Sequence, residues 1–252
     1  MIDMKNNRDF VKKVDEELKN NKEKMNIREK KKLQVLRNLI NIEYSIFEIS
    51  IADFMFGMTT EEDAYLSMEY KMLVSLYTCL KLNEVSLYGE AKMIYRNIYE
   101  TLIVLKGIRV KKSRKLFEQW YNLNKNISIQ DKILNPIKKP DNSNLKQFYK
   151  YLCTYCHSNP VMGQMINEDD HKCGELKESI IMLEILILMN YFFLINFVTT
   201  KSKYNLKTYA PDHFGKYKDL KKQFNLKKKN MYNRLNKLSK DTIRDFKAEW
   251  KI

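Results

Sequence analysis

The feature that most constrains the fold is a helical period of apolar residues that recurs along most of the chain. It is clearest in residues 83–109, where Ile94, Ile98, Leu102 and Leu105 follow one another at spacings of three or four. Such spacing places the side chains on one face of a helix, and that face has to be buried. With 6 Gly and 4 Pro among 252 residues, the chain is poor in turn-forming residues. We therefore predict an all-α fold, a bundle of about six or seven helices.

The same period predicts further helices at residues 7–25, 27–57, 60–82, 111–126, 144–157 and 174–200. Thr59 and Glu62 have the spacing of a capping box, so we expect a helix to begin at residue 60. We expect another helix to end at His157, because Pro160 prevents it from continuing much further. Short connections predict antiparallel hairpins, with residues 180–198 at the centre of the bundle and residues 83–109 beside them.

Residues 180–198 are nearly all apolar, and their length is close to the roughly 20 residues that a membrane span needs. Glu184 and Asn190 would be costly in lipid, however, and a bundle of this size needs one helix that is buried on most sides. The N-terminus is charged and lacks an apolar segment typical of an export signal. We therefore expect a cytoplasmic protein and no membrane partner.

The basic residues are concentrated near the C-terminus. We divide the chain into a helical bundle domain, residues 1–200, and a linker with a small basic helical C-terminal appendage, residues 201–252. Residues 212–252 contain thirteen Lys or Arg and five Asp or Glu, so they hold 13 − 5 = +8 of the chain's +15. Such an excess suits a phosphate backbone, and the predicted nucleic-acid-binding residues are Lys227, Lys228, Lys229 and Arg234. A general richness in lysine, spread over solvated faces, would give the same count.

Aromatic residues accompany this charge. Tyr217, Tyr232 and Trp250 could stack on bases, but their helical spacing favours packing on the bundle. Leu220, Phe224 and Leu226 are predicted to line the same apolar stripe.

The string Cys153-Thr-Tyr-Cys156-His157 has the spacing of a haem attachment site, which we reject because no export signal is expected. Together with His171 and Cys173, the two cysteines could form a Cys₃His zinc site. A helix also accommodates free Cys as a small apolar residue, and this is the more ordinary interpretation. We expect no metal and no cofactor.

The candidate chemistry lies on two helices. Arg96 and Glu100 are four residues apart beside an apolar stripe, and Tyr149, Cys153 and His157 are spaced by four on a second helix. We predict that the two faces meet and that Arg96, Glu100 and His157 form one polar cluster. Arg96 could hold a phosphate, His157 could move a proton and Glu100 could orient either one. The alternative is a structural ion pair and histidine that hold two helices in register.

The motif Arg96-x-x-x-Glu100, followed by Tyr151-Leu-Cys153-x-x-Cys156-His157-Ser-Asn-Pro160, resembles an uncharacterised bacterial family of helical proteins across residues 61–194. That family has an Arg-x-x-x-Glu helix and a second helix that ends in Tyr-x-x-Ser-x-x-x-His. Cys153 stands where the family usually has Ser, and Cys156 stands at an apolar position of the pattern.

More distantly, the arrangement resembles the HEPN superfamily of helical bundles, many of which are ribonucleases of toxin and antiphage systems. Their sites use Arg-x(4–6)-His, usually across a dimer. In this sequence Arg114 is the nearest arginine before any histidine, so that motif is absent, and Arg96 could act with His157 only across helices. The resemblance implies a defence or toxin-type protein that binds or cleaves RNA, with RNA favoured over DNA and a homodimer as one arrangement. The alternative is a scaffold that binds nucleic acid or protein without catalysis.

Overall fold

The computed structural model describes residues 5–54, 59–111, 118, 149, 152–153, 176, 178–191, 193–195, 207–208 and 211–235. Among these residues the secondary structure is helical and contains no strand, which confirms the predicted all-α bundle. The helix expected at 111–126 and the loops around it lie largely outside the described residues, as does the end of the helix expected at 144–157.

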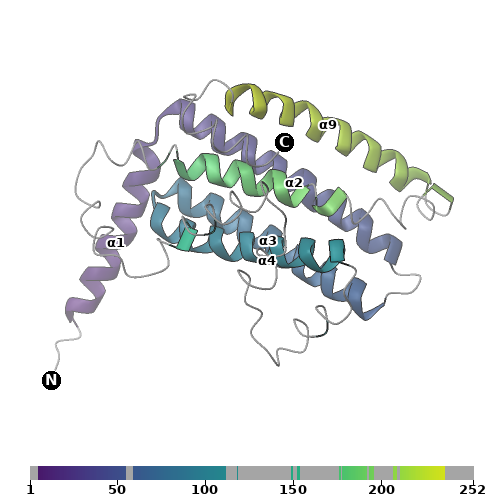
Figure 1. Ribbon diagram of the computed structural model, residues 1–252. Coiled ribbons are helices and arrows are strands. Elements are labelled where there is room, and N and C mark those ends of the chain that lie inside the picture. Colours follow the sequence, from purple (N-terminus) through teal and green to yellow (C-terminus); the bar gives the residue numbers. More distant parts are fainter. Residues whose placement is uncertain are drawn as a thin grey trace.

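The helices with defined bounds are α1 (Lys5–Lys24), α2 (Ile27–Phe54), α3 (Thr60–Glu84), α4 (Tyr88–Lys111) and α9 (Pro211–Leu235). Helix α3 packs against both α2 and α4, and α9 packs against α2. Figure 1 shows α9 running along α2 on one side of the bundle, with α3 and α4 on the other side and α1 at one end.

Helix α3 begins at the predicted capping box. The Thr59 side chain accepts a hydrogen bond from the Glu62 backbone N–H at 3.2 Å, and the Glu62 carboxylate accepts one from the Thr59 backbone N–H at 2.9 Å. Two of the backbone donors that the start of a helix leaves open are thereby satisfied. This local signal fixes where α3 starts.

The turn between α3 and α4 corrects one predicted boundary. The helix expected over residues 83–109 begins only at Tyr88, because α3 continues to Glu84. Ser86 has a φ of 66°, and the Leu87 backbone N–H donates to the Leu82 carbonyl at 2.9 Å. A residue in the left-handed region reverses the chain at this point, which the helical spacing of the apolar residues did not reveal.

The centre of the bundle is the helix Glu178–Ile195, drawn in green between α2 and α3 in Figure 1. Leu183, Leu186 and Leu194 are fully buried. Its length and composition, with a mean hydropathy of 1.9, would suffice to cross a membrane, but 71% of this helix is buried inside the bundle. The predicted central position is therefore confirmed, whereas the cytoplasmic location stays a prediction.

The sequence pattern places the linker at residues 201–215 and predicts a helix from residue 216, but α9 begins at Pro211, five residues earlier. Proline fits the first turn of a helix, and Asp212 interacts favourably with the positive end of the helix dipole. Tyr217 and Phe224 are buried, which confirms that Tyr217 packs on the bundle. Leu226 is 60% exposed, so its predicted place in the apolar stripe is wrong; it stands two residues from Phe224, on the opposite side of the helix.

Candidate functional sites

Arg96 and Glu100 form the predicted pair on α4. Arg96 Nε donates to Glu100 Oε1 at 2.8 Å, and the two side chains are 26% and 22% exposed. The Arg96 guanidinium carbon lies 5.7 Å from the centre of the Tyr149 ring. The segment that carries Tyr149 therefore lies against this face of α4, as the spacing of the residues predicts.

Tyr149 is held in its neutral form at this pair. Burial raises the pKa of the Tyr149 hydroxyl, the negative charge of Glu100 raises it further, and a hydrogen bond with Arg96 opposes both effects. A neutral phenol can donate or accept a hydrogen bond, but it is a poor base. His157 lies outside the described residues, so its approach to Arg96 and Glu100 stays a prediction.

The zinc alternative rests on residues that the structure describes only in part. Cys153 is half-buried, while Cys156, His171 and Cys173 lie outside the described residues. Within the described part of the chain, no three His, Cys, Asp or Glu side chains gather closely enough to hold a metal ion.

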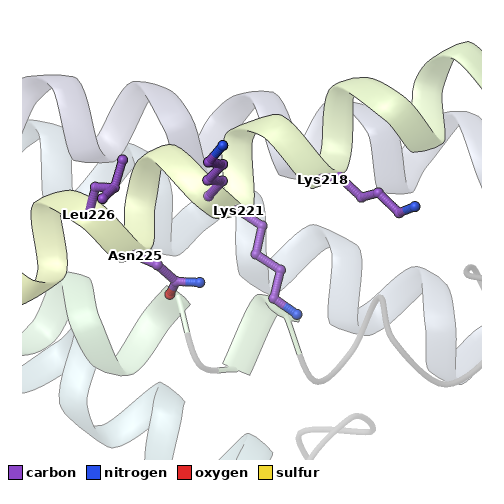
Figure 2. A pocket seen from close by; sticks show the side chains of 5 residues that line it. Lys218, Lys221, Asn225 and Leu226 are labelled. Carbon is purple, nitrogen blue, oxygen red and sulfur yellow. The ribbon is translucent and has the colours of Figure 1, made fainter.

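Several of the positive charges of α9 lie close together on its surface. Lys218, Lys221 and Lys222 line a shallow surface depression together with Asn225 and Leu226 (Figure 2). The Lys218 ammonium stands 4.5 Å from the centre of the ring of Phe214, which lies one turn earlier on the same helix. Lys227, Lys228, Lys229 and Arg234 belong to the same helix, and their side chains lie outside the described part.

A third site was not predicted from the sequence. Glu43 of α2, Glu69 of α3 and Asn190 of the central helix meet in the core, where they are 0%, 2% and 0% exposed. Asn190 Nδ2 donates to Glu43 Oε2 at 2.9 Å and to Glu69 Oε1 at 2.7 Å. In the sequence Asn190 stands out as a polar residue in an apolar helix. The two carboxylates that it contacts are 147 and 121 residues away along the chain, so the sequence does not connect them with it.

Burial shifts both acids toward their protonated forms. It raises the pKa of Glu43 well above its usual value, and it raises the pKa of Glu69 to about 8. The hydrogen bond from Asn190 opposes the shift in both cases, and the neighbouring Glu69 raises the pKa of Glu43 further. Within the described part of the chain neither carboxyl group has a positive partner, which is unusual in a protein core.

A neutral polar network lies at the other end of the central helix. Tyr95 of α4 accepts a hydrogen bond from Asn83 Nδ2 at 2.7 Å and donates to the Ser179 carbonyl at 3.1 Å. Asn83 Nδ2 also donates to the Cys79 carbonyl at 2.7 Å. These groups connect α3, α4 and the central helix, and so they fix how the three helices align.

Comparisons of this chain with protein-family models, with curated proteins and with solved structures found no match.

Proposed function

We propose that this protein binds nucleic acid, RNA in preference to DNA, through the basic face of α9. The observation that carries the proposal is the charge of this helix. Its sequence contains seven Lys and one Arg against two Asp, so its net charge is 7 + 1 − 2 = +6. Tyr217 and Phe224 are buried, while Lys216, Lys218 and Lys222 are exposed.

Ammonium groups spread along a helix suit the phosphate backbone, since each contact releases a condensed counterion. The helix is held at its apolar side by α2 and by the stacking of Phe224 on Tyr191, whose ring centres are 3.5 Å apart. The charged side therefore keeps a fixed orientation relative to the bundle. The preference for RNA rests on the resemblance to RNA-directed helical proteins.

Fluorescence anisotropy with labelled single-stranded RNA and with DNA of the same sequence, at several KCl concentrations, tests the proposal. We expect the triple variant Lys218→Ala, Lys221→Ala and Lys222→Ala to bind RNA about tenfold or more weakly. The slope of the logarithm of the binding constant against the logarithm of the salt concentration should become less steep by about 2, roughly 0.7 for each lost phosphate contact. The matched control replaces the exposed Lys12, Lys13 and Lys19 of α1 by alanine, so that it loses the same amount of positive charge as the α9 variant. Equal losses in both triple variants would contradict a specific role for α9.

For the reaction, we assign Arg96, Glu100 and His157 as the residues of a metal-independent ribonuclease site. Arg96 is partly exposed and could contact a phosphate. Its planar guanidinium can donate two parallel hydrogen bonds to one phosphate, whereas a lysine ammonium cannot. His157 would transfer the proton of the 2′-OH, and Glu100 would orient Arg96. Incubation of total cellular RNA with the wild type, His157→Ala and Arg96→Lys in a chelator tests this assignment. Cleavage by the wild type that both variants lose, with unchanged circular dichroism, supports it; equal cleavage by His157→Ala contradicts it.

The second candidate is a scaffold that binds nucleic acid or protein without catalysis. It is favoured by the engagement of Arg96, whose guanidinium already contacts the Glu100 carboxylate and the Tyr149 ring. A guanidinium held in this way stabilises the contact between α4 and the segment that carries Tyr149. RNA binding without cleavage in the experiments above would select this candidate. The homodimer stays a prediction, which size-exclusion chromatography with light scattering can test.

A further inference from the structure

The buried cluster of Glu43, Glu69 and Asn190, here called the acidic cluster, has more acceptors than donors. Both amide hydrogens of Asn190 are used, one on each carboxylate. Glu43 Oε1, Glu69 Oε2 and Asn190 Oδ1 are buried oxygens that have no hydrogen-bond partner among the described residues. Unpaired buried acceptors are rare in proteins, because each has given up its hydration without compensation.

No basic side chain of the described residues compensates the acidic cluster. The buried Lys92 ammonium contacts Glu178 at 2.8 Å, and Arg37 contacts Glu84, so these two cations serve other carboxylates. Glu43 and Glu69 interact within the described part of the chain only with each other, with Asn190 and with Tyr191. A full charge at this depth requires a counter-charge or protonation.

The distances within the acidic cluster suit a coordinated cation. The oxygen and nitrogen of an Asn amide occupy nearly equivalent positions, and a half-turn of the amide exchanges them. With Oδ1 in the place of Nδ2, the amide oxygen would stand 2.9 Å from Glu43 Oε2 and 2.7 Å from Glu69 Oε1. Two oxygens bound at about 2.1 Å and at right angles to the same ion are about 3.0 Å apart, which is close to both values. Without an ion, an amide oxygen in this position would repel both carboxylate oxygens.

We propose that Glu43, Glu69 and Asn190 bind one divalent cation in the core of the bundle. Two carboxylates balance its double charge, and with the amide they offer up to five oxygen ligands from three helices. A site made of oxygens alone suits hard cations such as Mn²⁺, Mg²⁺ or Ca²⁺. The cation would pin α2, α3 and the central helix together, and this role is independent of RNA binding at α9.

Purified full-length protein, treated with a chelator and dialysed, is the material for the test. Mn²⁺ is the first probe, and Mg²⁺ and Ca²⁺ are titrated in parallel. We expect the wild type to retain about one Mn²⁺ per chain after gel filtration, measured by plasma mass spectrometry. We also expect the melting temperature to rise by about 5 to 10 °C at a hundredfold excess of the ion over its Kd.

The decisive variant is Glu43→Gln with Glu69→Gln, which preserves shape and removes both charges. It should fold at least as well as the wild type in the chelator, because it no longer buries two acids, and it should lose both the bound Mn²⁺ and the thermal shift. Glu48→Gln is the matched control, since Glu48 is an exposed carboxylate on the same helix α2. This variant should retain the ion and the full thermal shift.

Two outcomes overturn the proposal. The first is a wild type whose melting temperature is the same with and without all three ions and that retains no more Mn²⁺ than the double variant. The two carboxyl groups would then hold protons in place of a cation. The second is a thermal shift that persists in the double variant, which would place the ion elsewhere on the chain.

Discussion

The two ends of the central helix present polar groups to the core in opposite ways. At the Ser179 end, Tyr95, Asn83 and Ser179 form a neutral network in which one buried oxygen, Asn83 Oδ1, has no hydrogen-bond partner among the described residues. At the Asn190 end, about three turns away, three oxygens of the acidic cluster have no partner within the described part of the chain. The first arrangement stabilises the alignment of the helices by itself, whereas the second depends on protons or on a bound ion.

The difference shows that burial of a polar group is neither stabilising nor destabilising by itself. A neutral hydroxyl or amide that finds its partner contributes about 1 kcal/mol net, whereas a charge without a counter-charge costs several. Evolution tolerates such a cost chiefly where the group has a function. The predictions below test whether the two ends respond differently.

The largest effect is expected for Asn190→Leu. Leucine has a similar volume but cannot donate to Glu43 or Glu69, so both carboxyl groups lose their hydrogen-bond donor. We expect the free energy of unfolding, measured by urea denaturation in a chelator, to fall by about 3 to 5 kcal/mol. The same substitution in the Glu43→Gln and Glu69→Gln background should cost much less. A loss below about 1 kcal/mol in the wild-type background would refute the account of the acidic cluster.

The pH dependence of stability is the next largest effect. The pKa of Glu69 is about 8 in the folded protein, against the ordinary value of 4.5. Between these values the folded protein binds the proton and the unfolded chain does not, so stability in a chelator should fall as the pH rises. We expect a loss of about 2 kcal/mol between pH 6 and pH 8.

Glu69→Gln should reduce this slope, and the double variant with Glu43→Gln should remove it. Tyr95→Phe, which changes only the neutral end, should keep the slope of the wild type. A flat profile in the wild type would show that the acids are already ionised in the fold.

A smaller effect is expected for Tyr95→Phe. The change removes the donor to the Ser179 carbonyl and the acceptor of Asn83 Nδ2, which keeps its bond to the Cys79 carbonyl. We expect a loss of about 1 to 2 kcal/mol in urea denaturation. A loss as large as that of Asn190→Leu would contradict the contrast between the two ends.

The smallest effect is expected for Lys92→Met. Lys92 is buried, but its partner Glu178 is 43% exposed and regains water when the ammonium is removed. Methionine fills the space of the aliphatic stem, so we expect the free energy of unfolding to change by less than about 1 kcal/mol. A loss of several kcal/mol would show that this ion pair, and not the neutral network, holds the Ser179 end together.

Features set by neighbouring residues could be predicted from the sequence. The capping box at Thr59, the pair Arg96 and Glu100, and the apolar stripe of the central helix all depend on spacings of three or four residues. The start of α9 was missed because Pro211 and Gly215 suggest a linker, although a helix tolerates proline in its first turn.

The acidic cluster could not be predicted in the same way. Glu43 and Glu69 stand in helices with many other charged residues, and nothing near them in the sequence marks them as buried. Their burial is a consequence of how α2, α3 and the central helix pack, and this depends on the whole fold. The one local sign was Asn190, a polar residue within an apolar helix.

The position of the central helix in the chain has a consequence for synthesis. A ribosome makes α2, α3 and α4 first, and it reaches residue 178 only after more than sixty further residues. At about 5 to 20 residues per second, the nascent chain would wait several seconds with its apolar helix faces uncovered. During this time water can reach Glu43 and Glu69, and any ion can enter, before the central helix closes over them. The growing chain is therefore most exposed to aggregation, and most open to its ligand, in this interval.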